Sequence, residues 1–298
     1  IQQGRELLSM DPYILIWVYI LAGVFGLCVG SFLNVLIYRL PRGMNIAFPA
    51  SHCTNCNYKL KWYDNIPVLS YIILRGKCRN CGARISPRYT IVEILNCLIW
   101  LACVWAFNSY GIGYIVCSAL ALSALIVVFF SDLETMLIPD SMTIGVALCA
   151  IAELILEIFG LGIGISWPDR LIGGVAAFAV FALIYFIFLR IKKREGLGFG
   201  DVKLVGAIGL LLGWQSLILC IILACVGALV TVLIVNAVSS FKAKKSPPDN
   251  AGAEESGEEN EETSQGGEFP FGPFLAAAAA VCVFFGQTVI QWYTGLFM

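Results

Sequence analysis

The sequence predicts an all-α polytopic membrane protein, with about eight transmembrane helices and a small cytoplasmic domain between the first and the second. Three observations support this fold class. Of the 298 residues, 59% are apolar and only 13% are charged, whereas soluble domains carry roughly 25% charged residues. The mean hydropathy is +0.84. The apolar residues also form long runs between polar loops, which is the pattern of successive membrane spans.

The first predicted transmembrane helix covers residues 13–38. This run has no charged residue, and about 26 residues at ~1.5 Å each are enough to cross a hydrocarbon layer of ~30 Å. It is too long for the core of a signal peptide and lacks a basic segment before it, so we interpret it as a retained span. Residues 1–12 are expected to be an extracytoplasmic N-terminal segment, in which Ile1–Ser9 precede what resembles a natural start at Met10.

Residues 39–88 are predicted to be a cytoplasmic domain that binds zinc. Four of the 12 cysteines occur here as two Cys-x2-Cys pairs, Cys53 with Cys56 and Cys78 with Cys81. Each pair presents two sulfurs to one ion, so that two pairs complete a tetrahedral Zn²⁺ site with no open position, which indicates a structural metal. Two disulfides are the alternative, disfavoured in a reducing cytosol. His52, the only histidine, is interpreted as a bystander, and the other eight cysteines as small residues facing lipid or core.

The remaining membrane core is predicted over residues 89–237, with the last helix in 271–298. Spans are expected at about 89–108, 112–131, 142–159, 171–189, 201–213, 216–237 and 271–292. With the 39–88 domain in the cytoplasm, all but Arg5 and Arg170 of the 19 Lys and Arg residues fall on cytoplasmic loops or helix ends, as the positive-inside rule requires. Counting spans then places Asp132 and Asp201 on the cytoplasmic side.

The loop 238–270 is expected to be acidic, cytoplasmic and largely disordered. Eight of the chain's 20 acidic residues lie between Asp249 and Glu268. Its 246–268 insert is rich in Pro, Gly, Ser and Glu and has almost no apolar residue to bury. A solvated linker is the favoured interpretation, and an interaction tail is the alternative.

Two carboxylates are the candidate catalytic residues. With a single histidine, a Ser/His/Asp triad is not available, which leaves the few acids within or bordering the spans. Asp132 follows an apolar run and Asp201 follows a glycine-rich one, both on the same side. Two facing carboxylates share a proton, so that one acts as a base on water and the other as an acid. Spacing alone leaves open that they are unrelated helix-end residues, with Asp201 an N-cap.

The segment 201–213 is too short to cross the bilayer unless its start is submerged, being about 20 Å long as a helix. Asp201 is therefore expected below the membrane surface in a water-accessible cleft. Gly198 and Gly200 would let the backbone that carries Asp201 approach Asp132 and leave room for an extended substrate.

Several ordered sequence blocks resemble the bacterial prepilin peptidases, the type IV leader peptidase family of intramembrane aspartic proteases. The blocks are Gly30–Pro41, the two cysteine pairs flanking Asn65-Ile66-Pro67, Ile85–Tyr89 with Val92-Glu93, Asp132 with Ile138-Pro139-Asp140, Gly198–Lys203 and Pro270–Leu275. The resemblance implies that Asp132 and Asp201 are the catalytic pair, with Asp140 a nearby non-catalytic residue and Gly198, Gly200 and Lys203 supporting residues of the same motif.

The resemblance also implies substrates and a location. Family members cut the basic leader from prepilins or pseudopilins of type IV pili or protein secretion systems, on the cytoplasmic side of the bacterial inner membrane. Cleavage follows a glycine and precedes an apolar helix. Glu134, Asp140 and Glu195 would attract the basic leader.

The resemblance implies a second activity as well. Members with the cysteine-bearing domain commonly also N-methylate the new terminus with S-adenosylmethionine, for which Glu93 is a candidate residue that binds the new amino group. No nucleic-acid partner is expected, and the sequence leaves the oligomeric state open. The chain departs from the family pattern in its acidic 246–268 insert.

Two other functions remain open at this stage. A proton- or ion-coupled transporter would place acids at mid-span depth, where only Glu153 and Glu157 are expected. A non-enzymatic scaffold for pilus assembly would use the zinc loop as its docking element.

Overall fold

The computed structural model describes residues 11–192, 198–243 and 270–296, and in these ranges the chain is almost entirely helical. Its long helices are α2 (Pro12–Arg39), α4 (Arg88–Phe107), α5 (Ile112–Thr135), α6 (Asp140–Ile158), α7 (Trp167–Lys192), α8 (Phe199–Ala243) and α9 (Gly272–Gly295). Within the described ranges, these seven are long and apolar enough to cross a membrane. The predicted extension 1–9, Glu195 and the 246–268 insert lie outside the described residues.

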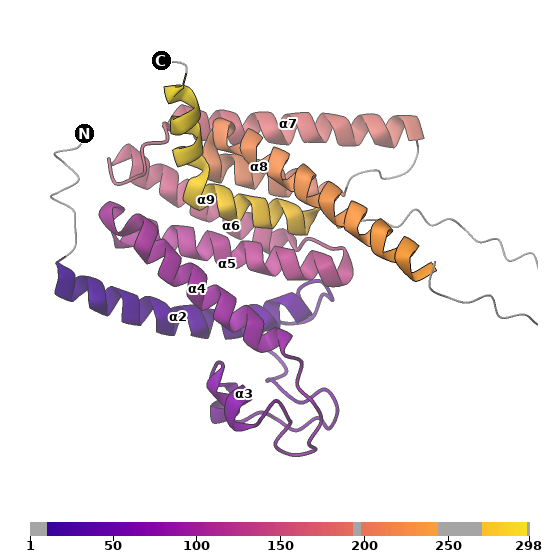
Figure 1. The fold of residues 1–298 in the computed structure, drawn as a ribbon. Coiled ribbons are helices and arrows are strands. Elements are labelled where there is room, and N and C mark those ends of the chain that lie inside the picture. The colour runs from indigo at the N-terminus through magenta and orange to yellow at the C-terminus, as the bar shows by residue number, and fades with distance from the viewer. Residues whose placement is uncertain (1–10, 193–197, 244–269, 297–298) are drawn as a thin grey trace, which may run out of the picture.

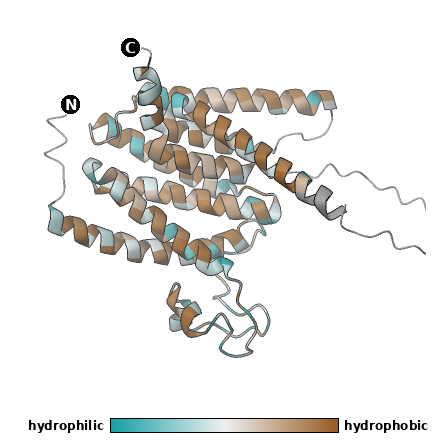
Figure 2. Ribbon diagram, in the orientation of Figure 1, coloured by the Kyte–Doolittle hydropathy of each residue, from teal (hydrophilic) through white to brown (hydrophobic). Residues whose placement is uncertain are grey.

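The long helices form a layered bundle with α5 at its centre (Figure 1). Helix α5 contacts α2, α4, α6 and α9, whereas α8 contacts α6, α7 and α9. Hydrophobic residues cover the helices, and hydrophilic residues gather at helix ends and in the small domain (Figure 2). The all-α polytopic fold class is confirmed.

The predicted count of eight spans differs from the seven observed helices at one place. The predicted spans 201–213 and 216–237 both lie in α8, which is interrupted at Gly213 by a non-helical backbone with φ 76° and ψ 164°. The chain reverses there. Gly206 packs against Phe178 of α7, whereas Gly227 packs against Phe274 of α9. Helix α8 thus supplies two passes joined by a tight turn that only glycine adopts readily.

Glycines hold the first part of α8 directly against α7. A Cβ on Gly209 would lie 2.4 Å from the carbonyl oxygen of Gly173, and one on Gly173 would lie 2.6 Å from the carbonyl oxygen of Gly209. Neither position therefore accepts a larger residue, and the two backbones touch, as is common for helices in lipid. This contact fixes the segment that begins with Asp201.

Arg170 corrects the loop assignment made from the sequence. It was expected on an extracytoplasmic loop, but it lies in α7 and is 0% exposed. Its Nη1 donates to Glu153 Oε2 at 3.2 Å and to the carbonyl oxygen of Leu211 at 2.8 Å. Leu211 lies just before the Gly213 turn, where the end of a helix leaves carbonyl groups without intrahelical partners. Arg170 is therefore a buried cap for the first part of α8.

A small domain occupies the connection between α2 and α4 and lies beside these two helices (Figure 1). It contains a 3-10 helix (Trp62–Asn65), the short α3 (Leu69–Ile73) and two isolated antiparallel bridges, His52 with Lys59 and Lys77 with Arg84. Among the hydrophobic residues of 40–87 only Cys78 is buried, so the domain has almost no apolar core of its own. The four clustered cysteines lie in it.

Candidate active site

Asp132 lies in the last turn of α5 and is 5% exposed. The C-terminal end of a helix carries partial negative charge and disfavours a carboxylate. The first turn of α9, which carries partial positive charge, faces Asp132 instead: a Cβ on Gly272 would lie 2.6 Å from Asp132 Oδ2. Gly272 thus lets a helix N-terminus approach the carboxylate closely enough to stabilise its ionised form.

Asp201 lies in the first turn of α8, which begins at Phe199. Helix α8 therefore begins before Gly200, and the suggestion that Asp201 is an N-cap is wrong. The backbone N–H of Asp201 donates to the carbonyl oxygen of Gly198 at 3.1 Å, while its Oδ1 is buried without a hydrogen-bond partner in the described part of the chain. A buried carboxylate oxygen without a partner is costly in a structural residue and is typical of functional sites.

The loop that follows Asp132 brings the two acids to the same place. Ile138 in this loop lies against both helix starts: a Cβ on Gly200 would be 3.1 Å from Ile138 Cβ, and one on Gly272 would be 3.2 Å from Ile138 Cδ1. Asp132 contacts Gly272 and Asp201 follows Gly200, so both acids lie at the helix ends that Ile138 joins. Gly200 packs closely against Ile138 inside helix α8, and the structure gives no left-handed backbone at Gly198 or Gly200.

Two ion pairs surround the two aspartates. Lys203 Nζ donates to both carboxylate oxygens of Asp140, at 2.8 and 2.9 Å, and so ties the start of α8 to the start of α6. Arg88, the first residue of α4, pairs with Glu134, two residues after Asp132. Since Asp140 and Glu134 already have cationic partners, their capacity to attract a basic leader is weaker than the sequence suggested.

The four cysteines of the small domain form one cluster. The sulfurs of Cys53, Cys56, Cys78 and Cys81 lie within 4.8 Å of one another, with 3.9 Å between Cys53 and Cys81 and 4.0 Å between Cys56 and Cys78. A tetrahedral Zn²⁺ site with Zn–S bonds of ~2.3 Å has sulfurs ~3.8 Å apart. The arrangement therefore fits a metal of this kind.

The two halves of the cluster support each other. Asn55 Nδ2 donates to the sulfur of Cys81 at 3.6 Å, and Asn80 Nδ2 donates to the sulfur of Cys56 at 3.6 Å. Each asparagine immediately precedes the second cysteine of its own pair and reaches across to the other pair. The backbone of Ala83, and next the Asn55 amide, lower the pKa of the Cys81 thiol to about 6, which favours the thiolate that binds metal.

His52 contacts the backbone and not the cysteine cluster. One ring nitrogen lies 3.0 Å from the carbonyl oxygen of Ala50, and the metal-ligating group found in the described chain consists of the four cysteines. The interpretation of His52 as a bystander agrees with this position.

Glu93 lies in the second turn of α4 and is 8% exposed. Its Oε2 accepts the backbone N–H of Val68 at 2.7 Å, and Gly30 of α2, the neighbour of Ser31, packs against its backbone. The structure therefore places Glu93 between α2, α4 and the loop that returns from the small domain. It is separate from the two aspartates.

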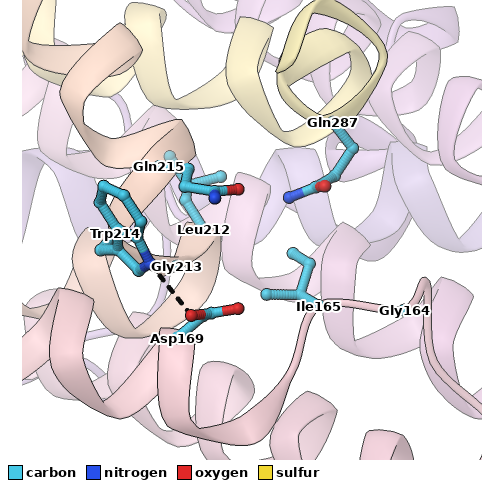
Figure 3. A pocket seen from close by; sticks show the side chains of 8 residues that line it. All are labelled: Gly164, Ile165, Asp169, Leu212, Gly213, Trp214, Gln215 and Gln287. Atoms are coloured by element: carbon cyan, nitrogen blue, oxygen red, sulfur yellow. Dashed lines mark hydrogen bonds between the residues drawn. The ribbon is translucent and has the colours of Figure 1, made fainter. Parts of the chain in front are cut away.

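A small hollow of about 70 Å³ lies at the opposite end of the first α8 segment, by the Gly213 turn. In Figure 3, Trp214 donates a hydrogen bond to Asp169 on one side of the hollow, and Gln287 lies on the other side. The segment from Asp201 to Gly213 is ~20 Å long as a helix. This hollow therefore does not belong to the aspartate pair.

Two family profiles match the chain. The profile of the bacterial peptidase A24 N-terminal domain matches residues 24–107, and that of the type IV leader peptidase family matches residues 119–233, which contain both aspartates. A prepilin leader peptidase/N-methyltransferase of Aeromonas hydrophila is 31% identical over 309 residues, covering 95% of this chain and 96% of the relative. The chain belongs to the type IV leader peptidase family.

Other relatives carry the same name. One from Pseudomonas putida is 32% identical and covers 95% of the chain and 94% of its own length. One from Myxococcus xanthus is 40% identical over 213 residues, and the chain spans 61% of its length. No solved structure matches the chain.

Some site features of the leader peptidase were not predicted from the sequence. The approach of Gly272 to Asp132, the Arg88–Glu134 pair and the crossed Asn55 and Asn80 contacts depend on long-range packing. A partial signal existed for the asparagines, since Cys-x-Asn-Cys occurs in both cysteine pairs.

Proposed function

We propose that this protein is an intramembrane aspartic endopeptidase that removes the leader from type IV prepilins or pseudopilins, with Asp132 and Asp201 as the catalytic pair. The observation that carries the proposal is the meeting of two largely buried carboxylates, neither paired with a cation in the described structure, at one end of the bundle. The family assignment supports it, and the relatives are named prepilin leader peptidases.

The proposed mechanism needs no covalent intermediate. One aspartate is ionised and takes a proton from water as the water oxygen attacks the carbonyl carbon of the scissile peptide. The other, protonated, donates to the developing oxyanion. Protonation of the leaving amine then allows the C–N bond to break, leaving a carboxylate on the leader and a free amine on the mature substrate. The Asp132 position beside the α9 N-terminus favours its ionised form, so we assign it as the base.

The substrate fits the bundle by its apolar part. The apolar helix that follows the cleavage point would lie in the bilayer beside the spans, with the scissile bond at the end where Asp132 and Asp201 meet. The positive-inside bias supports placing this end in the cytoplasm, and a multi-pass protein of the bacterial inner membrane is the location that follows.

A second proposed activity is N-methylation of the new amino terminus, as in the relatives named N-methyltransferase. S-adenosylmethionine would supply the methyl group from its sulfonium. The residues proposed for the two activities lie in different matched profiles. Glu93 and the cysteines lie in 24–107, and the two aspartates lie in 119–233.

The cysteine cluster is proposed to hold structural Zn²⁺. All four sulfurs are used, so the metal has no open position for catalysis. Metal analysis of a Cys78→Ser variant tests this assignment: we expect zinc to fall from one per chain to well below that, and unchanged stoichiometry would reject the four-cysteine site.

Asp132→Asn and Asp201→Asn variants, incubated with a prepilin in detergent, test the peptidase. Each should lose cleavage, while Asp11→Asn, a change at the N-cap of α2 that retains a capping side chain, should cleave normally. Cleavage retained by either active-site variant would reject the pair. The transporter alternative is not favoured, because Glu153, the deeply buried acid, is bound by Arg170 and Ser118.

A further inference from the structure

Glu93 is an acid that lacks the partner a structural role would require. Four other acids of the bundle and the small domain have cations: Glu134 pairs with Arg88, Asp140 with Lys203, Glu153 with Arg170 and Asp64 with Arg79. Within the described residues no ion pair reaches Glu93, although it is buried. An uncompensated buried carboxylate is costly, and Asp132 and Asp201 share this property.

A buried hydrogen-bond acceptor near Glu93 has no donor in the described structure. Ser31 follows Gly30, which packs against Glu93, so its hydroxyl lies on α2 within reach of the carboxylate. One turn along α2, Asn34 donates its amide to the carbonyl oxygen of Tyr89 at 3.0 Å, while its Oδ1 is buried without a partner. A polar atom buried in this way calls for a donor from a ligand. Glu93 lies at the contact between α2 and α4, where a Cβ on Gly30 would be 2.8 Å from Glu93 Cα, and Asn34 lies one turn farther along α2.

The loop above Glu93 is held in an unfavourable conformation. Val68 has φ 60° and ψ −49°, which is rare for a β-branched residue. Its N–H donates to Glu93 at 2.7 Å. Backbone strain of this kind is found where ligands bind more often than elsewhere, and here it positions a donor on one carboxylate oxygen only.

Glu93 lies close to the end of the bundle that carries the two aspartates. Arg88 begins α4 and pairs with Glu134 near Asp132, and Glu93 follows Arg88 by five residues, or ~7.5 Å along the helix. An amine released at the aspartate pair therefore reaches Glu93 without crossing the bundle.

We propose that Glu93, Ser31 and Asn34 form a binding site for an ammonium group. A carboxylate with two neutral acceptors satisfies the three N–H donors of such a group and neutralises its charge. The inference rests on the proposed methylation, and two ammonium groups are available there: the new amino terminus of the cleaved substrate and the amino group of S-adenosylmethionine.

A Glu93→Gln variant of the full-length protein separates charge from shape, because glutamine still accepts the Val68 N–H. Its matched control is Glu157→Gln, which removes a half-buried carboxylate from the other end of the bundle. Prepilin cleavage and the unfolding temperature should stay close to wild type in both variants. Glu93→Gln is expected to lose methylation. If it lost cleavage or stability to the same extent, Glu93 would be a structural residue and the proposal would be overturned.

Binding is measured with three probes: a peptide with the mature free amino terminus, the same peptide N-acetylated, and S-adenosylmethionine. If the site takes the substrate amine, the wild type should prefer the free amine at least tenfold, and Glu93→Gln should lose this preference. If it takes the donor's amino group, Glu93→Gln should weaken S-adenosylmethionine binding tenfold and leave the peptide preference intact. Unchanged binding of all three probes would overturn the site.

A second variant guards against indirect effects. Ser31→Ala removes one acceptor and leaves Glu93 in place, so it should reduce the same binding step about threefold, and no change would remove Ser31 from the site. If the wild type cleaves but adds no methyl group, the proposed methyltransferase activity fails, while the binding measurements still decide whether Glu93 holds an ammonium group.

Discussion

Gly272 meets Asp132 so closely that a Cβ at position 272 would lie 2.6 Å from the Asp132 carboxylate oxygen. The contact joins the first turn of α9 to the last turn of α5, two helices that are more than 130 residues apart in the chain. The partial positive charge at the start of α9 thereby offsets the partial negative charge at the end of α5, where Asp132 lies.

Gly272→Ala should lower prepilin cleavage about 10- to 100-fold, because the added methyl group displaces the Asp132 side chain and errors near 1 Å cost rates of this order. Cleavage kinetics in detergent measure the effect. Gly295→Ala is the control at the other end of α9, where a Cβ meets no atom within 4 Å. Equal cleavage by both variants would show that the Gly272 contact is unimportant for catalysis.

Asp140→Asn should reduce cleavage by less than about tenfold. Its pair with Lys203 is largely exposed, with side-chain exposures of 62% and 35%, and such pairs contribute about 0–1 kcal/mol. Asp201→Asn, measured in parallel, should abolish cleavage. A complete loss in Asp140→Asn would mean that this residue acts in the chemistry.

Asn55→Ala and Asn80→Ala should each weaken metal binding, and the double variant should lose more than about tenfold, as expected when hydrogen bonds to metal ligands are removed. Competition with a chelator measures the affinity. Thr54→Ala is the control, since Thr54 lies in the same turn and is exposed. Identical affinities in all variants would show that the 3.6 Å contacts to sulfur are incidental.

Glu153→Gln should destabilise the bundle by about 3–5 kcal/mol, because it leaves the charge of Arg170 buried and unpaired. We expect the unfolding temperature in detergent to fall by about 6 °C or more. The double variant Glu153→Met with Arg170→Met should recover much of this loss, since it removes both charges. A single variant as stable as wild type would contradict the ion-pair interpretation.

Local sequence patterns were sufficient to predict most of the helices. Long apolar runs predicted the positions of the long helices, and the Cys-x2-Cys spacing predicted a cluster whose four sulfurs are found together. Charge bias failed for Arg170, because a positive residue paired inside the bundle looks the same in sequence as one in a loop. The two predicted spans of α8 appear in the structure as one element, because a single non-helical residue, Gly213, joins them.

The candidate site was only partly accessible from the sequence. The depth and side of Asp201 were argued from span length and parity, but its pairing with Asp132 came from family resemblance. The contacts that create the pairing run through Ile138, Gly200 and Gly272, and no local pattern specifies such contacts between distant helices. The catalytic roles stay predictions until the variants are assayed.

The first segment of α8 is short, so the thickness of the membrane should affect how water reaches Asp201. From Phe199 to Leu212 it covers only ~21 Å as a helix, against ~30 Å of hydrocarbon, and it is anchored to α7 along its length and to Arg170 at its far end. The segment is therefore held in place and cannot shift to bring Asp201 to the bilayer surface. Acyl-chain length therefore sets how far water must descend to reach Asp201, and activity should be highest in thin bilayers and decline as the lipids lengthen.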